Sequence, residues 1–347
     1  MTEDAQKSVL WWGRFDPDYS RNRILRQAFE ALGWHIIDFH PHVSALAHWE
    51  VGLRSIKKPD IVWVPAFRQR DMTAAAKWAT PRKIPLVFDP LISAYDKQVF
   101  ERQKFSEGSE KARKLLRREK AQFDAADKVI ADTDGHAKFF AGTFDIILEK
   151  ITVIPVSAEE NLFLPKPVQP KSDMLEALFF GSFIGLQAPA VIVEAAKLCT
   201  APIHWTLLGN GSEKAACETL AAGQENISFE DYLPYDQLPA RIHKADILLG
   251  IFGATDKAAR VIPNKVYQAL ACGRPVVTRA SNAYPEETTG LLQIPAGNPQ
   301  ALAEVMERLY KGRENLAERG AAARQYYEQH FSTRKVEDSL RSVLASL

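Results

Sequence analysis

The sequence predicts an α/β protein built from two units, each a parallel sheet with helices on its faces. Short apolar runs alternate with stretches of helical periodicity from residue 8 to about 155, and again from about 177 to 294. This alternation is typical of parallel sheets. The segment 165–173 holds three prolines and few apolar residues, which indicates a linker. A chain of 347 residues also fits two domains.

Each series contains six candidate strands. In the first unit we expect strands at 9–12, 35–39, 61–64, 86–88, 128–131 and 151–155, and in the second at 177–180, 204–208, 227–229, 247–251, 275–278 and 291–294. Helices follow at 301–310, 314–330 and 333–347. We therefore expect a first domain at 1–165, a second at 171–330, and a C-terminal helix at 331–347 that crosses back onto the first domain.

Composition and charge exclude several classes of protein. The net charge of +1 gives no overall attraction to nucleic acid. The three cysteines, Cys199, Cys217 and Cys272, lack the spacing of metal ligands. No apolar run approaches the roughly 18 residues of a membrane span, and the first residues do not resemble a signal peptide. We expect a cytoplasmic protein.

Polar residues follow two strands of the first unit, at the sheet edge where open α/β sheets bind ligands. Arg14, Asp16, Arg21 and Asn22 lie in or just after the loop that follows the first strand. They are candidate substrate contacts, with solvated loop residues as the alternative. Asp89 directly follows the fourth strand. It either points into a cleft or forms a turn before a proline.

Three further features of the first unit are the predicted ends of one helix, a histidine at the start of another, and a basic segment. Ser20 is a predicted N-cap and Gly33 a predicted stop for one helix. His136 begins a later helix and either touches substrate or serves as a capping or surface residue. Residues 101–120 carry eight Lys or Arg against four Glu with helical spacing. This segment is either a solvated helix face or a surface for anionic lipid headgroups.

Glycines follow two strands of the second unit and let a ligand approach the backbone. They occur in 181–185 and in 209–211, although glycines after strands also form ordinary turns. A short helix is expected between Pro263, which suits a first helical position, and Gly273, which suits a C-terminal cap. Its apolar positions should be buried, with a lysine and a glutamine on another face.

Lys265 near the start of this helix opposes the helix dipole. That arrangement is favoured if an anion lies between the lysine and the helix, and Arg260, one loop earlier, can reach the same anion. The two residues then form a phosphate clamp. Solvated surface charges are the alternative.

The chain resembles a glycosyltransferase of the two-domain GT-B fold, most closely the retaining family 4. The segments that support the resemblance are 13–19, 126–131, 180–183, 208–211, 245–250, 260–277 and 289–299. In such enzymes two Rossmann-like domains face each other across a cleft. The second binds a nucleotide-sugar donor and the first binds the acceptor, a glycan or lipid-linked saccharide.

The resemblance also implies site residues, retention at the anomeric carbon and no metal or other cofactor. Donor contacts are expected at Gly181, Ser182, Phe183, Gly209, Asn210, Gly211, Tyr232, Leu233, Pro263, Asn264 and Gln268, those near Tyr232 through the backbone. Acceptor contacts are expected at Arg14, Asp16, Arg21, Asn22 and His136. Arg260, Lys265 and Asp89 are the expected catalytic residues.

Two departures from the family pattern concern the donor site. Many members have two glutamates eight residues apart, and the second of these falls at Gln268, while no acid lies at Arg260 or Val261. Gln268 can still accept and donate hydrogen bonds to ribose hydroxyls. The Gly181 loop also lacks the Arg and Lys that many members place there.

Three other function classes have different requirements. A sugar-nucleotide epimerase of the same fold would need paired acid and base groups. A non-catalytic protein that binds nucleotide sugars would fit the missing acids. A dinucleotide-dependent oxidoreductase would need Gly-x-Gly-x-x-Gly after the first strand, which 13–16 does not supply. We expect a glycosyltransferase.

Overall fold

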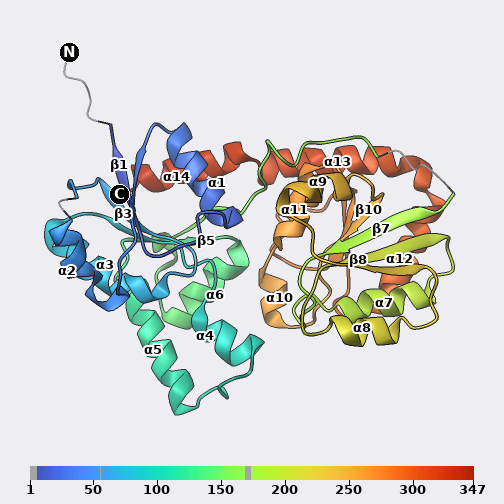
Figure 1. Cartoon of the computed structure of the whole chain (residues 1–347), viewed down its shortest axis with the longest axis horizontal. Helices are drawn as coiled ribbons and strands as arrows, with labels where there is room; N and C mark the ends of the chain where they lie inside the picture. Colours follow the sequence, from blue (N-terminus) through green and yellow to red (C-terminus); the bar gives the residue numbers. More distant parts are fainter. Residues whose placement is uncertain (1–5, 55, 169–172) are drawn as a thin grey trace. The chain divides into compact units, whose positions relative to one another are not determined.

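The computed structural model describes residues 6–54, 56–168 and 173–347 (Figure 1). These residues form two compact units. The first contains the described residues up to Val156 together with Thr333–Leu347, and the second contains those of Ser157–Ser332. In the described parts of the chain, no helix has both the length and the apolar character to cross a membrane.

The first unit is built on a parallel sheet with the strand order β2-β1-β3-β4-β5-β6. Its strands are β1 (Ser8–Trp12), β2 (His35–Phe39), β3 (Ile61–Val64), β4 (Leu86–Phe88), β5 (Lys128–Ala131) and β6 (Ile151–Val153). Its helices are α1 (Ser20–Ala31), α2 (Ala47–Leu53), α3 (Met72–Ala79), α4 (Ala94–Asp96), α5 (Glu110–Asp124), α6 (Asp134–Phe144) and α14 (Thr333–Ala345).

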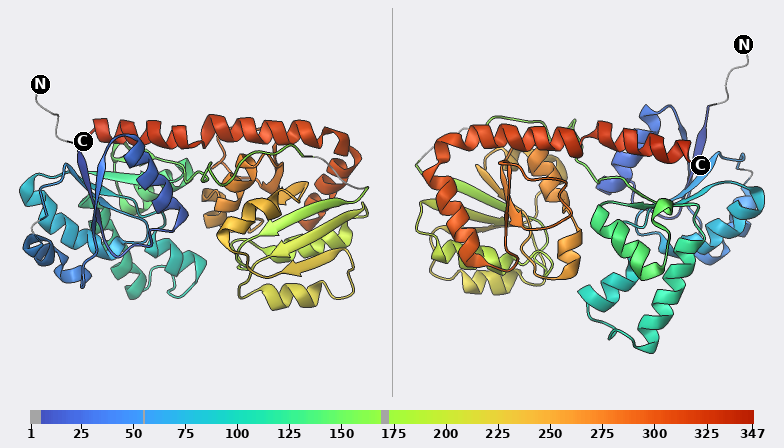
Figure 2. Two further views of the ribbon diagram at one scale, coloured as in Figure 1. Left: turned by 45° about the horizontal axis from the view of Figure 1, so that its top comes forward. Right: turned by 180° about the vertical axis from the view of Figure 1, so that it is seen from behind.

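Both faces of this sheet are buried, as is usual for parallel sheets. Successive strand residues point to opposite faces, so Val9 and Trp11 pack in one core while Leu10 and Trp12 pack in the other. The first of these cores also contains Val336, Leu340 and Val343 of α14. Figure 2 shows α14 beside α1. The predicted return of the chain to the first unit is confirmed.

The second unit is built on a parallel sheet with the strand order β12-β11-β10-β7-β8-β9. Its strands are β7 (Leu175–Phe180), β8 (Ile203–Leu208), β9 (Ile227–Glu230), β10 (Ile247–Leu249), β11 (Val276–Arg279) and β12 (Leu291–Ile294). Its helices are α7 (Pro189–Leu198), α8 (Lys214–Leu220), α9 (Leu238–Ile242), α10 (Asp256–Arg260), α11 (Asn264–Ala271), α12 (Pro299–Lys311) and α13 (Leu316–His330). The predicted class of two Rossmann-like α/β units is confirmed.

All of the predicted strands are present, with ends within two residues of the expected positions. Gly33 ends α1 with a positive φ of 78°, as expected. The prediction that Ser20 is an N-cap is wrong, because Tyr19 occupies that position and its carbonyl accepts hydrogen bonds from the Asn22 and Arg23 amides. Ser20 is instead the first residue of the helix.

The described residues of the predicted linker pack on the second unit. Phe163 is fully buried, Val168 lies in the second unit's core, and the Lys166 carbonyl accepts a 2.6 Å hydrogen bond from Arg274. The boundary therefore follows Val156 rather than residue 165, because these contacts fix the intervening segment. Pro170 of the predicted linker lies outside the described residues.

Candidate active site

Two glycine loops interlock where β7 and β8 of the second unit end. The Gly181 amide donates to the Leu208 carbonyl and the Phe183 amide to the Asn210 carbonyl, both at 2.9 Å. Gly209 has φ 134°, and a Cβ there would lie 2.0 Å from the Gly181 oxygen. A side chain at this position would clash with backbone. The structure thus brings together the predicted donor loops 181–183 and 209–211.

Lys265 of α11 is a buried cation next to these loops. Its side chain is 6% exposed. The Nζ atom donates to Gln187 Oε1 and lies 3.5 Å from the centroid of the Phe179 ring. A Cβ at Gly181 would lie 3.1 Å from the same Nζ. Burial lowers the pKa of Lys265 well below its ordinary value, and a bound anion would reverse this shift because an opposite charge favours the ammonium form.

Helix α11 owes its position to its two ends. Pro263 is the N-cap, rather than the first helical residue that the sequence suggested. Gly273 has φ 67°, and the Gly273 and Arg274 amides donate to the Leu270 and Ala269 carbonyls, which is a Schellman motif. The predicted C-terminal cap is confirmed.

The expectation of a separate polar face on α11 is wrong. Lys265 and Gln268 are buried together with Val266, Ala269 and Leu270. The reason is that the helix packs against α13 as well as β11, so that hardly any of its surface reaches solvent.

Gln268 belongs to a hydrogen-bond chain that sequence spacing did not reveal. Its Nε2 donates to the Tyr235 hydroxyl at 3.2 Å, and that hydroxyl donates to Glu159. Tyr235 also packs edge-on against Phe163, with ring centroids 5.6 Å apart. Because Nε2 is engaged, the Gln268 carbonyl oxygen is the group that can accept a hydrogen bond from a ribose hydroxyl.

The hydrogen bonds from Gln268 through Tyr235 to Glu159 favour a glutamine over a glutamate at position 268. In Gln268→Glu the carboxylate and Glu159 would compete for the single Tyr235 hydroxyl proton. We expect the second unit to lose about 1–3 kcal/mol of stability. Urea unfolding at pH 7 measures this loss, and the deficit should shrink below about pH 5, where a protonated glutamate regains a donor. The exposed Gln325→Glu is the control. Equal midpoints for both variants would contradict the hydrogen-bond chain.

The other predicted donor residues differ in how far their side chains are exposed. Phe183 is fully buried and packs against Phe179, so a ligand can meet its backbone but not its ring. Tyr232 is 74% exposed, which suits a flat ligand surface. The remaining predicted residues are exposed at Ser182 and Asn210 and half-buried at Leu233, Arg260, Pro263 and Asn264.

Arg21 and Asp89 of the first unit form a buried ion pair. Both side chains are fully buried, and Arg21 donates to the two Asp89 carboxylate oxygens at 3.0 and 3.3 Å. Arg21 also donates to the Ile154 and Pro155 carbonyls. Burial raises the pKa of Asp89, against the opposing effect of Arg21. This geometry gives the pair a structural role at the sheet edge, and the expected substrate roles of the two residues stay predictions.

The other predicted acceptor residues also surround this sheet edge. His136 is buried, stacks on Phe140 and hydrogen-bonds Asp132 through Nδ1. Asn22 is buried and donates to the Asp16 carbonyl at 2.7 Å. The side chains of Arg14 and Asp16 are exposed and therefore remain the accessible members of this predicted set.

Several residues of these sites were not predicted, namely Asp132, Glu159, Gln187 and Tyr235. Each contacts a site residue from a different element, and no motif in the sequence distinguishes it. The one signal in the sequence was the missing acid near residue 260, where many family members have a glutamate. In the described residues no group of three or more His, Cys, Asp or Glu side chains could hold a metal ion, and the expectation that no metal is required stays a prediction.

Comparison with known proteins finds similarity to glycosyltransferases, with the family match in the second unit. Residues 175–312 match the family model described as Glycosyl transferases group 1. The amylovoran biosynthesis glycosyltransferase AmsK of Erwinia amylovora is 26% identical over 210 residues. That alignment covers 57% of this chain and 51% of AmsK, so this chain matches about half the length of its relative.

Solved structures are similar over nearly the whole chain. Anabaena Alr3699/HepE in complex with UDP has a TM-score of 0.74 and 15% identity, covering 98% of this chain and all of that one. Sucrose-phosphate synthase from Thermosynechococcus elongatus has a TM-score of 0.74 and 16% identity, covering 99% of this chain and 100% of that one. The chain therefore has the fold of the GT-B glycosyltransferases, and its residues 175–312 match the glycosyltransferase group 1 family model.

Proposed function

We propose that this chain is a glycosyltransferase of the retaining, family 4 type, which moves a sugar from a nucleoside diphosphate sugar to a hydroxyl acceptor. The observation that carries the proposal is the buried Lys265 ammonium beside the interlocked loops at Gly181 and Gly209. Two features suit a diphosphate: glycine backbone that a ligand can approach, and a cation that has no carboxylate partner among the described residues. The group 1 family match covers all three residues.

The names of similar proteins narrow the donor and the pathway within this proposal. HepE has been solved with UDP and with UDP-glucose, and AmsK is named for amylovoran biosynthesis. We therefore propose a uridine diphosphate sugar as the donor and a hydroxyl of a growing polysaccharide or lipid-linked saccharide as the acceptor. The acceptor binds on the first unit, where Arg14 and Asp16 are exposed. A cytoplasmic location and a hexosyl group belong to the same proposal.

The proposed chemistry places charge where the second unit has cations. When the bond from the anomeric carbon to the nucleoside diphosphate breaks, negative charge grows on the departing phosphate oxygens. Lys265, Arg260 and the N-terminus of α11 stabilise that charge more in the transition state than in the ground state. Gln268 binds the ribose through its carbonyl oxygen. In this proposal the sugar is transferred with retention and without a metal.

A thermal-shift screen with UDP, GDP, ADP, TDP and their common sugar conjugates tests the proposed donor site. A ligand at about 100 times its dissociation constant adds about 2.7 kcal/mol to stability. UDP and one UDP-sugar should raise the melting temperature most, and the effect should vanish in Lys265→Ala. If no nucleotide raises it, the donor site is absent and the transferase proposal fails.

Arg260→Ala should slow sugar transfer by about 30-fold or more, because one fixed cation at a developing charge contributes about 2–4 kcal/mol. Initial rates of UDP release with a saturating donor measure this effect. Arg308→Ala, at an exposed position of α12, is the control and should leave the rate unchanged. Unchanged turnover in Arg260→Ala would remove this residue from the catalytic machinery.

A further inference from the structure

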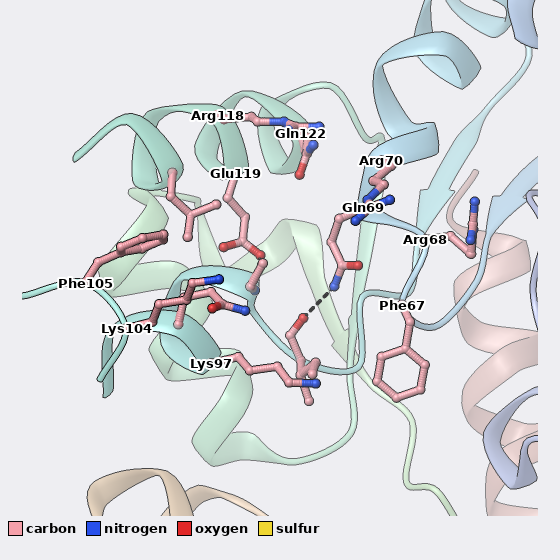
Figure 3. Close-up of a pocket in the computed structure, with 14 residues that line it drawn as sticks. Phe67, Arg68, Gln69, Arg70, Lys97, Lys104, Phe105, Arg118, Glu119 and Gln122 are labelled. Atoms are coloured by element: carbon pink, nitrogen blue, oxygen red, sulfur yellow. Dashed lines mark hydrogen bonds between the residues drawn. The ribbon is translucent and has the colours of Figure 1, made fainter. Parts of the chain in front are cut away.

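The first unit contains a cavity of about 490 Å³ that the proposed donor chemistry does not use. Its walls are the segment 67–70 after β3, the segment 92–98 that includes α4, and the face of α5 at 115–122 (Figure 3). The first two segments follow the carboxyl ends of β3 and β4. Open α/β sheets bind ligands outside these strand ends, so the cavity lies where a ligand of the first unit is expected.

The cavity lining is strongly basic. Five cations line it, namely Arg68, Arg70, Lys97, Lys104 and Arg118. Arg68 is paired with Asp71. The other four have no hydrogen bond or ion pair from their side chains to any residue that the structure describes. The segment 101–120, predicted to be a helical basic face, supplies two of them. Within this segment only Glu101 and the residues from Glu110 onward are helical.

Glu119 does not neutralise these cations. Among the described lining residues it is the only acid, and it is buried. Its carboxylate accepts hydrogen bonds from Ser93 Oγ and from the Ala94 and Tyr95 amides, at 2.7 to 2.9 Å. These bonds fix the segment around α4 against α5. Glu119 therefore shapes the cavity wall, and the lining keeps a surplus of positive charge.

Gln122 adds an uncharged hydrogen-bond donor to the cavity lining. The residue as a whole is 5% exposed. Figure 3 shows it extending from α5 on the same side of the cavity as Arg118. An amide N–H can donate to a phosphate oxygen of a ligand that occupies the cavity.

Phe67 adds an apolar edge to the cavity. Its side chain is 42% exposed, and its backbone has φ 65°, a conformation that bulky residues rarely adopt. The ring lies 5.0 Å from that of Tyr19. A strained, exposed aromatic residue at a basic cavity is typical of a functional position. It offers a flat apolar surface to whatever is attached to the anion.

We propose that this cavity binds the diphosphate group of the acceptor, and this inference rests on the proposed transferase function. Four cations that have no carboxylate partner in the described part of the chain match a multivalent anion better than a single carboxylate. Arg118 and Lys97 bind the phosphate oxygens, Gln122 donates its amide, and Phe67 contacts the group attached to the diphosphate. The diphosphate belongs either to a lipid-linked saccharide or to a soluble one.

Calorimetric titration of the full chain with inorganic pyrophosphate tests the cavity. Lys97→Gln/Arg118→Gln should weaken binding at least tenfold. Lys114→Gln/Arg117→Gln removes the same charges from exposed positions of α5 that do not line the cavity, and it should change the dissociation constant less than twofold. Equal losses in the two double variants would show general charge attraction and overturn the proposal.

A third variant separates this cavity from the donor site. Lys265→Ala should abolish UDP binding while leaving pyrophosphate binding in the presence of UDP unchanged. The cavity variants should bind UDP normally and lose pyrophosphate binding. If UDP does not bind but the cavity variants still lose pyrophosphate, the anion site stands and the transferase proposal fails. If pyrophosphate binding depends on Lys265 alone, the cavity proposal fails and the donor proposal stands.

Farnesyl diphosphate distinguishes the two sources of the diphosphate. Binding at least tenfold tighter than pyrophosphate, lost in Lys97→Gln/Arg118→Gln, assigns a lipid-linked acceptor. Equal binding of both probes assigns a soluble diphosphate. In transfer assays the cavity variants should raise the KM for a diphosphate acceptor, with donor hydrolysis unchanged. An unchanged KM overturns the acceptor role.

Discussion

Lys265→Met should abolish most sugar transfer and, at the same time, make the second unit more stable. The ammonium is buried over the Phe179 ring and has no carboxylate partner in the described structure. Replacing a buried charge with an apolar side chain of similar length is often stabilising by about 1–4 kcal/mol. The same charge is worth about 2–4 kcal/mol at the departing diphosphate. The cost to folding and the gain in catalysis thus come from one group.

The measurement combines thermal unfolding with the initial rate of UDP release. We expect a higher melting temperature and a rate about 30-fold to 1,000-fold lower. Lys311→Met, at an exposed position of α12, controls for the loss of a lysine and should change neither. A less stable Lys265→Met with normal activity would mean that the ammonium supports the fold and not the reaction.

The pH dependence follows from the lowered pKa of Lys265. Below that pKa the lysine is protonated in both the folded and the unfolded chain, so the penalty of burial is complete. As the pH rises from there towards the ordinary value of 10.5, the folded chain binds fewer protons than the unfolded chain, and its stability increases. The advantage of Lys265→Met should therefore shrink over this window. UDP affinity should fall over the same window, since the anion prefers the ammonium.

Asp89→Ala should unfold the first unit or come close to doing so. It would leave the fully buried Arg21 guanidinium without its counter-ion, and breaking a buried pair from one side costs about 3–5 kcal/mol. Tryptophan fluorescence during urea unfolding reports on this unit, because Trp205 alone among the seven tryptophans lies outside it. We expect a large fall in the midpoint for this variant.

A double variant separates this structural role from a catalytic one. Arg21→Met/Asp89→Leu removes both charges and should recover much of the lost stability. Asp338→Ala, on the exposed side of α14, is the control. A normally stable Asp89→Ala that has lost activity would instead restore Asp89 as a catalytic residue and contradict the structural role.

Local sequence was sufficient for the sheets and for the two glycine loops. The runs at 61–64 and 86–88 are apolar and short, and they form strands with these bounds. Gly209 and Gly273 have the positive φ values that their turns require. Such features depend on a few neighbouring residues, and so their pattern is visible in the chain itself.

Side-chain partners could not be predicted, because they are far apart in sequence. Lys265 meets Gln187 across 78 positions, and Tyr235 meets Glu159 across 76. The burial of Lys265 also depends on α13 covering α11, which helical periodicity does not reveal. Charge alone left a phosphate clamp and solvated surface charges as alternatives for Lys265, whereas the structure buries its side chain.

The position of α14 affects how the protein is made. Val336, Leu340 and Val343 belong to the same core as Val9 and Trp11, and the whole second unit lies between them in sequence. During synthesis, the first unit leaves the ribosome early but lacks part of its core until residues near 343 emerge. The second unit can finish folding first. Newly made first units must therefore wait with an exposed apolar face, which makes them natural clients for chaperones during translation.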